Sequence, residues 1–373
     1  MAYKTILITG GAGFIGAHIA NELLEHGYRV RVLDSLVPQV HGPDRSRPVY
    51  LDTDVELIVG DIRDSEVLSR ALRQIDSVIH LVALVGVGQS MYQIEEYTSV
   101  NNGGTATLMQ ALSKNPVESV VVASSMSVYG EGLYRNIEGL PWIGGTRSVD
   151  QLRMGNWEVT DDRGRPLIPI PTTEDKPPAL ASVYALSKYD QEQMTLMVAR
   201  AYGIRAVALR FFNTYGPYQA LSNPYTGVIS NFAVRVLHGE PPLIYEDGRQ
   251  KRDFVSVYDV ASACRLALGA RNADGEALNI SSGQAMTVGE IASKAIRALG
   301  ATGLHPEITA KYRVGDIRHC FADISRARKV LAWAPAVSLE EGLTDLAAWL
   351  EGQITTDRVV EARGELAARG LMI

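Results

Sequence analysis

A tyrosine and a lysine stand four positions apart in the stretch SVYALSKYDQEQMTLM, residues 182–197. If this stretch forms an amphipathic helix, Tyr184 and Lys188 share one of its faces. A neighbouring ammonium lowers the pKa of a phenol and makes it a usable base, so this pair could take a proton from a hydroxyl group. The spacing is also common by chance, and a harmless surface pair is the alternative.

Glycines that could hold a phosphate occur in ITGGAGFIG, residues 8–16. Gly10, Gly13 and Gly16 follow a predicted strand and open a predicted helix. Glycine permits the tight turn, lets backbone N–H groups approach a pyrophosphate and lets the helix pack close to the sheet. The helix N-terminus, with Phe14 and Ile15, would face the phosphates. The loop therefore predicts a dinucleotide site, with a purely structural turn as the alternative.

Acidic residues follow the second and third predicted strands. Asp34 lies 18 residues after Gly16, near the separation expected for an acid that binds a ribose diol. An acid there would repel the 2′-phosphate of NADP, so the predicted cofactor is NAD. Asp61 and Ile62 could contact the adenine, Asp61 through its carboxylate and Ile62 through its backbone N–H. A helix N-cap role for Asp61 or Asp64 is the alternative.

Alternating strands and helices must position these residues. Buried strands are predicted at 5–9, 28–34, 55–59, 77–83, 118–124 and 205–211, and helices at 14–27, 64–74, 94–114 and 182–202. Continuous rather than alternating apolar runs fit strands that are covered on both faces. The predicted fold is therefore α/β, a Rossmann-type doubly wound parallel sheet.

Two stretches interrupt this alternation. Residues 35–53 form a loop containing Pro and Arg, and residues 131–181 are rich in Gly, Pro, Trp and charge with little periodicity. So long a gap between a strand and a helix is unusual and often functional. We interpret 131–181 as an insertion beside the active-site cleft, either a lid or a passive surface excursion.

The alternation weakens after about residue 215. Helical patterns follow near 226–238, 259–270, 287–299 and 339–351, with short strand-like pieces among them. They predict a smaller C-terminal α/β substrate-binding lobe on the carboxyl edge of the sheet. We therefore expect a dinucleotide-binding domain (1–214), a substrate-binding lobe (215–351) and a C-terminal tail (352–373).

Composition limits the partners. The formal net charge is −6 and no Lys/Arg run stands out, so nucleic acid and anionic membrane are poor candidates. No apolar run approaches the roughly 20 residues that a membrane span needs. Cys264 and Cys320 have no metal-type spacing, so we predict no metal site and two reduced, buried thiols. A cytoplasmic protein is expected.

Five motifs in combination carry a resemblance. They are the glycine loop, SSMSVYG (124–130), YALSK (184–188), RFFNTYGP (210–217) and RDFVSVYDVA (252–261). With them the chain resembles the extended short-chain dehydrogenase/reductases, and within these the nucleotide-sugar epimerases and dehydratases. The resemblance covers about residues 1–350 except the insertion. It implies a nucleotide-diphosphate sugar as substrate.

The resemblance implies a catalytic triad of Ser125, Tyr184 and Lys188. Removing hydride from a carbinol requires removing its hydroxyl proton too, and tyrosine is a poor base at its ordinary pKa of roughly 10. Lys188 and the cationic nicotinamide are both expected to lower that pKa. Lys188 would also bind the nicotinamide ribose, and Ser125 would hydrogen-bond the sugar oxygen as it becomes a carbonyl. A capping or turn serine is the alternative for Ser125.

Further binding residues are implied by the same resemblance. The residues expected along the cofactor are Leu81, Ala83, Asn101 beneath the sheet edge, and Ser124. The residues expected on the substrate are Val85, Met126, Ser127, Asn213, Arg252 and Arg313. The two arginines would hold the diphosphate, since guanidinium forks match phosphate oxygens. Val85 stands where UDP-galactose epimerases typically have a lysine, so one pyrophosphate contact is absent.

The residues before VYG separate the reactions of this family. Dehydratases carry an Asp-Glu pair there and decarboxylating relatives commonly a glutamate, whereas this chain has Met126 and Ser127. Neither is a useful acid or base, which leaves redox-neutral inversion at sugar C4. The motifs most resemble the dTDP-L-rhamnose 4-epimerases, whose 6-deoxy sugar would suit an apolar wall of Val85, Val87 and Met126. UDP-hexose 4-epimerases are the nearest alternative.

An alternative from another class is a catalytically silent NAD-binding regulator, against which the intact triad argues. The resemblance also implies a homodimer. In this dimer the helices near 94–114 and 182–202 of one protomer would pack against those of the other across a two-fold axis.

Overall fold

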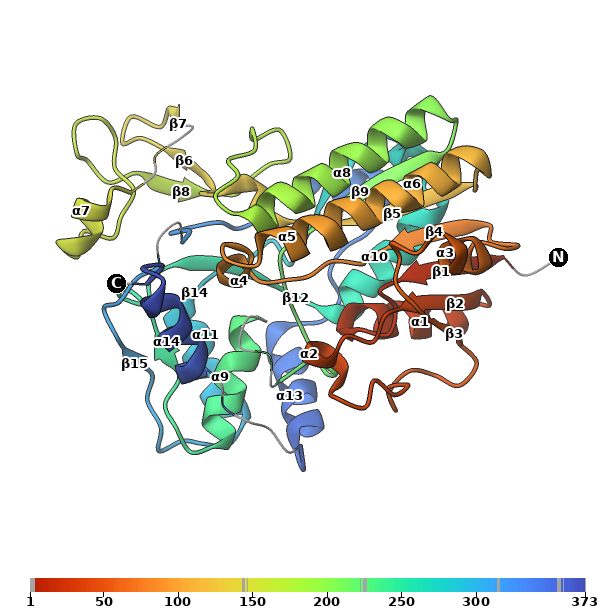
Figure 1. The fold of residues 1–373 in the computed structure, drawn as a ribbon. Helices are drawn as coiled ribbons and strands as arrows, with labels where there is room; N and C mark the ends of the chain where they lie inside the picture. The colour runs from red at the N-terminus through yellow and green to blue at the C-terminus, as the bar shows by residue number, and fades with distance from the viewer. Residues whose placement is uncertain are drawn as a thin grey trace.

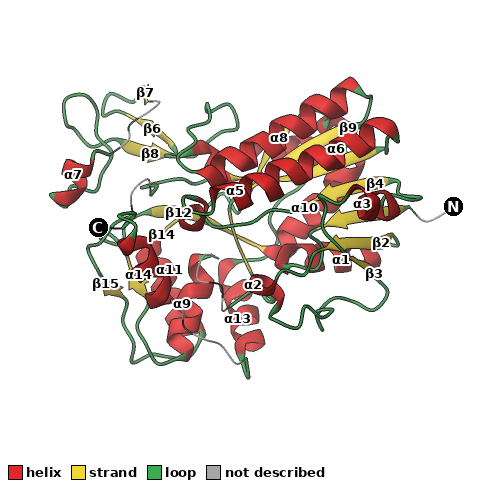
Figure 2. Cartoon of the chain, viewed as in Figure 1, coloured by secondary structure: helices red, strands yellow, loops and turns green. Residues whose placement is uncertain are grey.

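The computed structural model describes residues 4–142, 145, 147–221, 223, 227–313, 316–353, 357 and 359–372. A parallel sheet of seven strands lies at its centre (Figures 1 and 2). In spatial order the strands are β13 (Ala277–Ile280), β9 (Arg205–Phe211), β5 (Ser119–Ser125), β4 (Ser77–His80), β1 (Thr5–Thr9), β2 (Arg29–Asp34) and β3 (Glu56–Val59). The order reverses between β4 and β1, where folds of this kind form their ligand crevice.

Helices cover both faces of the central sheet. One face carries α3 (Ser65–Ala71), α6 (Gly104–Lys114) and α8 (Val183–Ala201), and the other carries α1 (Phe14–Glu25) and α10 (Val257–Gly269). Successive side chains of each strand point to opposite faces of the sheet. Leu7 and Val120 pack in the core cluster on one face, and Ile8 and Val121 pack in the cluster on the other. The inner residues of the strands are mainly apolar, so both layers are chiefly hydrophobic. The predicted Rossmann-type α/β fold is confirmed.

Short helices follow β2 and β4. α2 (Pro38–His41) lies in the loop after β2, and α4 (Val87–Ser90) lies in the segment after β4. The helix predicted at 94–114 is α5 (Ile94–Tyr97), a π-helical turn (Thr98–Gly103) and α6 in succession. Single π-helical turns within α-helices occur often at functional sites.

The C-terminal lobe lies beside the carboxyl ends of the strands (Figure 1). Its helices are α9 (Val228–Leu237), α11 (Val288–Ala298) and α13 (Leu339–Leu350), which share one apolar core. Its strands are β10 (Asn213–Tyr215), β12 (Lys251–Ser256) and β14 (Ala285–Thr287) in one sheet, and β11 (Leu243–Ile244) with β15 (Glu307–Ile308) in another. Capping boxes begin α11 at Thr287 and α13 at Ser338.

The chain crosses between the two lobes more than once. β13 forms the edge of the central sheet and α10 covers one of its faces, although both follow residue 214 in sequence. α12 (Ser325–Leu331) also packs beside this edge. A domain boundary at residue 214 would therefore separate β13 and α10 from the sheet to which they belong. β13 is also a seventh strand, in addition to the six predicted.

Residues 131–181 form a small antiparallel sheet of their own. The strand order in this sheet is β7 (Pro141–Trp142), β6 (Leu133–Arg135) and β8 (Ile168–Ile170), and α7 (Val149–Arg153) lies beside the sheet. Its core is a cluster of Tyr134, Val159 and Leu167. The insertion projects from the upper left of the molecule in Figure 2.

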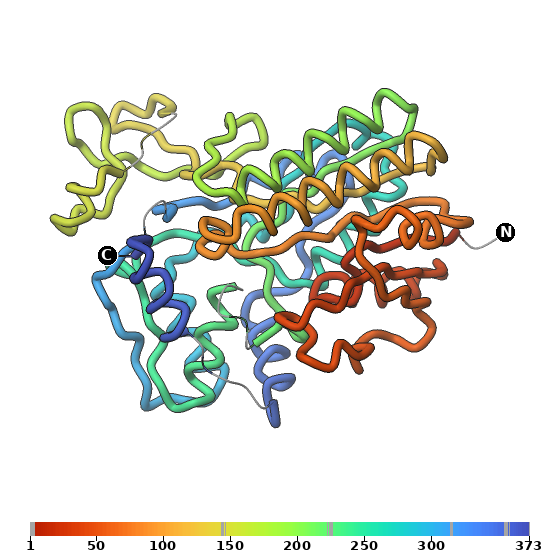
Figure 3. Tube along the Cα trace, viewed as in Figure 1, coloured from red at the N-terminus to blue at the C-terminus, as the bar shows by residue number. Residues whose placement is uncertain are grey.

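The C-terminal tail ends in α14 (Val359–Ala368). In Figure 3 this dark-blue segment lies beside the orange segment that contains α4. The contact is close, because a Cβ added at Gly88 would meet the Leu366 side chain at 3.0 Å. Tyr92 donates a hydrogen bond to Glu365 at 3.0 Å. None of the helices in the described part of the chain is long and apolar enough to cross a membrane.

Candidate active site

The triad residues come together where β5 ends against α8. β5 finishes at Ser125, and a 3-10 turn (Met126–Tyr129) follows it. α8 begins after Ser182, whose hydroxyl caps the helix by accepting from the Ala185 N–H at 3.1 Å. The first two turns of α8 carry Tyr184 and Lys188, and the Ser125 hydroxyl lies close enough to the Tyr184 phenol to lower its pKa. The structure therefore brings Ser125 and Tyr184 together.

The electrostatics of Tyr184 differ from the sequence-based expectation. Burial raises the pKa of its phenol, and only the nearby Ser125 hydroxyl acts to lower it. Burial also lowers the pKa of Lys188 to about 7, against the attraction of Glu192. In the protein alone no contribution of Lys188 offsets the burial of the phenol, and the lowering of its pKa by Lys188 and the cationic nicotinamide together stays a prediction. The positive nicotinamide remains the charge that could activate the phenol.

Gln191 holds the Lys188 amine, a contact that the sequence analysis missed. Lys188 Nζ donates to Gln191 Oε1 at 2.8 Å. The Gln191 amide nitrogen donates to Val82 O at 3.0 Å and to Thr105 Oγ1 at 2.8 Å, which fixes the oxygen toward the lysine. Gln191 is three residues after Lys188, so its position on the same helix face was a usable signal.

Asn101 lies in the π-helical turn and is fully buried. Its side chain accepts from the Leu84 N–H at 2.7 Å, and it donates to Leu84 O at 3.2 Å and to Ser187 Oγ at 2.9 Å. It therefore ties the segment after β4, which contains Leu81 and Ala83, to α8. This is the predicted place beneath the sheet edge, with its hydrogen bonds directed to the protein.

The glycine loop fits a dinucleotide phosphate. Gly10 has φ +72°, and a Cβ there would meet Val82 N at 3.0 Å. A Cβ at Gly16 would meet Gly11 Cα at 2.5 Å, so the helix packs as closely as expected. A Cβ at Gly13 would meet only Gly10 O at 3.6 Å, which leaves room beside the N-terminus of α1. Gly13 gives that helix no side-chain cap, so its first N–H groups are available to an anion.

Asp34 faces this loop from the end of β2. Its carboxylate accepts from the Ala12 N–H at 3.0 Å and the Leu36 N–H at 2.9 Å. His41 Nε2 lies 3.7 Å from Asp34 Oδ1, and burial lowers the pKa of His41 while Asp34 raises it. His41 Nδ1 is buried without a partner in the described residues. The remaining lone pairs of the Asp34 carboxylate and the Nδ1 atom of His41 could therefore hydrogen-bond to a ribose diol.

The alternative roles of Asp61 and Asp64 can be separated. Asp64 is the N-cap of α3 and accepts from the Glu66 N–H at 2.9 Å. Asp61 is instead paired with Arg63, whose Nε donates to it at 2.9 Å. The Ile62 side chain is buried, so only its backbone could reach a ligand.

Several predicted substrate residues have unused buried polar atoms. Among the described residues, Ser127 Oγ, Asn213 Oδ1 and Arg313 Nε are buried with no hydrogen-bond partner. These three atoms, at predicted contact positions, could therefore form hydrogen bonds with a substrate. Val85 and Val87 are 49% and 46% exposed, whereas Met126 is 9% exposed. The valines are available to an apolar group.

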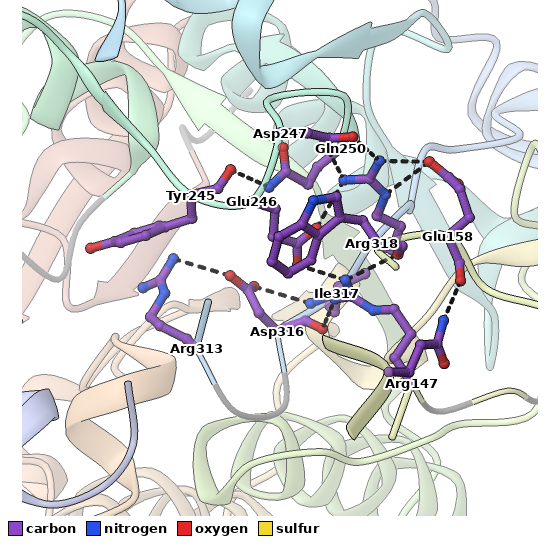
Figure 4. A network of polar contacts seen from close by, with 12 residues as sticks. Arg147, Glu158, Tyr245, Glu246, Asp247, Gln250, Arg313, Asp316, Ile317 and Arg318 are labelled. Carbon is purple, nitrogen blue, oxygen red and sulfur yellow. Dashed lines mark hydrogen bonds and ion pairs between the residues drawn. The ribbon is translucent and has the colours of Figure 1, made fainter. Parts of the chain in front are cut away.

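The two predicted diphosphate arginines meet at the carboxylate of Asp316. Arg313 Nη2 lies 3.5 Å from Asp316 Oδ2 (Figure 4). Arg252 Nη2 lies 3.9 Å from Asp316 Oδ1. The Arg313 guanidinium also lies 4.9 Å from the centre of the Tyr245 ring. From the tail, Arg363 approaches the same ring at 5.7 Å. The structure thus brings the arginines together, and the tail lies next to them.

Comparison with known proteins identifies the family. Residues 6–149 match the model of the NAD dependent epimerase/dehydratase family, and residues 165–346 match the model named GDP-mannose 4,6 dehydratase. The dTDP-L-rhamnose 4-epimerase of Burkholderia thailandensis is 35% identical over 357 residues, covering 94% of this chain and 96% of that protein. The chain belongs to the NAD-dependent epimerase/dehydratase family.

Solved structures agree with this membership. The UDP-N-acetylglucosamine 4-epimerase of Methanobrevibacter ruminantium, in complex with UDP-N-acetylmuramic acid, is 28% identical with a TM-score of 0.77, over 95% of this chain and 100% of that one. The UDP-glucose 4-epimerase of Thermus thermophilus, in complex with NAD, is 29% identical with a TM-score of 0.75, over 94% and 100%. The predictions of an extended short-chain dehydrogenase/reductase, of an NAD-dependent epimerase and of NAD as cofactor are confirmed.

Proposed function

We propose that this family member inverts C4 of a dTDP-linked 6-deoxy sugar, as a dTDP-L-rhamnose 4-epimerase. The observation that carries the proposal is the junction of β5 and α8. There Ser125 lies beside Tyr184 and is followed by Met126 and Ser127, where a dehydratase would need an acid and a base. The 35% identity to a protein of that name supports the substrate.

The residues of the chain would act in the following way. NAD, when bound, would supply a hydride acceptor and donor for sugar C4. Tyr184 takes the C4 hydroxyl proton as the carbonyl forms and gives it back to the opposite epimer. Ser125 donates a hydrogen bond to the same oxygen, and Lys188, held by Gln191, would bind the nicotinamide ribose. Arg252 and Arg313 hold the diphosphate while the 4-keto sugar turns.

The cofactor site is proposed residue by residue from the geometry above. The N–H groups of Phe14 and Ile15 at the start of α1 would meet the pyrophosphate, and Asp34 would hold the adenosine ribose. Asp61 and the Ile62 N–H would lie at the adenine. Leu81, Ala83 and Ser124 would line the nicotinamide half.

A UDP-hexose 4-epimerase is the second candidate, supported by the overall similarity to UDP-glucose 4-epimerase structures. The exposed Val85 and Val87 favour a methyl group over a hydroxymethyl group at C6. A panel of dTDP-, UDP- and GDP-sugars, incubated with the protein and followed by NMR without added NAD, tests both. We expect C4 inversion of dTDP-L-rhamnose to be fastest, and exclusive turnover of a UDP-hexose would replace our proposal by the alternative.

We also propose a homodimer formed through α5, α6 and α8. Apolar side chains on α5 and α8 are exposed, with Ile94 at 53%, Leu186 at 53% and Met197 at 66%. Burying such side chains between two copies would remove them from water.

A further inference from the structure

A buried arginine of the insertion is bonded to Asp316, which lies beside the two proposed substrate arginines. The Arg147 side chain is 3% exposed. It donates to Glu246 Oε1 at 2.6 Å, to Asp316 O at 2.8 Å and to Trp157 O at 3.2 Å, and it lies 3.7 Å from Glu131. Figure 4 shows Arg147 below Glu158 and beside the segment from Asp316 to Arg318. One guanidinium therefore joins the insertion to two loops of the C-terminal lobe.

A second arginine completes the junction. Arg318 is fully buried and donates to Glu246 Oε2 at 2.8 Å, to Asp247 at 2.7 Å and to Glu158 at 2.6 Å. The two oxygens of Glu246 thus accept from one arginine each. Glu158 belongs to the insertion, and hydrogen bonds from His319 and Arg318 lower its pKa to about 2. Removing one partner from such a network would leave a buried charge uncompensated.

The network extends directly to the proposed diphosphate site. Arg252 donates to Arg318 O at 2.9 Å and to Ile317 O, next to Asp316. The Asp316 carboxylate lies between Arg252 and Arg313, while its carbonyl oxygen accepts from Arg147. Arg147 therefore sets the position of the residue that spaces the two substrate arginines.

We propose that Arg147 is a positioning residue for the substrate diphosphate, acting through Asp316 on Arg252 and Arg313. The insertion 131–181 is then a fixed wall of the sugar-nucleotide site. This inference rests on the proposed function, because it assumes that Arg252 and Arg313 bind the diphosphate. An opening lid would have to separate Arg147 and Glu158 from their partners in the C-terminal lobe, and the network opposes that motion.

The test compares Arg147→Met with Arg153→Met in the full-length protein loaded with NAD. Arg153 is 61% exposed and pairs only with Asp150 in the described residues, so it controls for loss of an insertion arginine. Calorimetry with dTDP and dTDP-L-rhamnose should give a Kd raised at least tenfold for Arg147→Met and within twofold of wild type for Arg153→Met. Turnover at saturating substrate should fall less than KM rises, and NAD content should be unchanged.

A second, more conservative variant keeps the test decisive if Arg147→Met does not fold. Arg147→Lys keeps the charge beside Glu246 but replaces two guanidinium nitrogens by a single ammonium, so the bonds to Glu246 and to Asp316 O cannot both keep their geometry, and we expect a Kd raised about threefold to tenfold. Wild-type affinity for dTDP in both folded Arg147 variants would overturn this inference alone. Failure of the wild-type protein to bind any sugar nucleotide of the panel would overturn the proposed function, and this inference with it.

Discussion

Replacing Lys188 by Met should stabilise the protein near neutral pH while it abolishes the proposed catalysis. The lysine is 3% exposed, and burial lowers its pKa from 10.5 to about 7. The charged groups around it change little in this range. Burial and the lysine charge lower the pKa of His80 to about 3, and Glu192 is ion-paired with Arg210 at 2.6 Å. The difference in stability between wild type and Lys188→Met should therefore depend on pH mainly through the Lys188 amine.

The sign follows from proton binding. Because the folded pKa of Lys188 lies below the unfolded value of 10.5, the unfolded chain holds more protons between the two values. The penalty is fully present below the folded pKa and disappears as pH rises toward the unfolded one. It amounts to about 4 kcal/mol near neutral pH. A methionine at this position does not carry the cost of burying a charge. It leaves Gln191 Oε1 without its hydrogen-bond donor, which lowers the free energy of unfolding by about 1–3 kcal/mol.

The net expectation is a stabilisation of about 1–3 kcal/mol near pH 7. At about pH 10 the penalty has fallen to about 1 kcal/mol, so the replacement should be neutral or destabilise the protein by up to about 2 kcal/mol. Urea unfolding of NAD-stripped protein, measured over that range for wild type and Lys188→Met, tests it. Lys114→Met is the matched control, since Lys114 is exposed at the end of α6 and its replacement should show little dependence on pH. A stability difference for Lys188→Met that stays constant with pH would refute the reasoning.

The other predictions concern turnover, the cofactor and assembly. Tyr184→Phe should keep NAD bound but lower turnover by about 10²–10⁴-fold, and near-normal turnover would remove it as the base. Asp34→Ala should weaken NAD binding or reduce discrimination against NADP, and calorimetry showing neither would exclude its ribose contact. Gln191→Met should shift the pH–rate profile, because the loss of its acceptor oxygen disfavours the charged form of Lys188 and lowers the pKa of that amine further; an unchanged profile contradicts this. Leu186→Glu should yield monomers in sedimentation at micromolar concentration, whereas a wild-type protein that is already monomeric would contradict the dimer.

Local patterns sufficed for the parts of the site that lie at strand ends. The glycine loop, Asp34 and Ser125 each follow a buried strand, so a parallel sheet necessarily brings them to one edge. Tyr184 and Lys188 share a helix face for equally local reasons. These positions depend on residues near them in sequence, and a single sequence contains that information.

Properties that depend on tertiary burial were less predictable. The raised pKa of Tyr184 in the protein alone was not predictable, because it comes from desolvation, which the sequence does not display. β13 escaped prediction because this short strand follows a segment assigned to the other lobe. The partners of Arg147, Glu246 and Asp316, are 99 and 169 residues away, so no local pattern marks that network.

The central claim is that hydrogen leaves sugar C4 and returns to the same carbon within one active site. The most direct test is NMR of dTDP-L-rhamnose deuterated at C4, incubated with the purified protein in ordinary water without added NAD. We expect the 4-epimer to form with its deuterium retained at C4. Epimer that carries solvent hydrogen at C4, or turnover that consumes added NAD in proportion to product, would contradict the account.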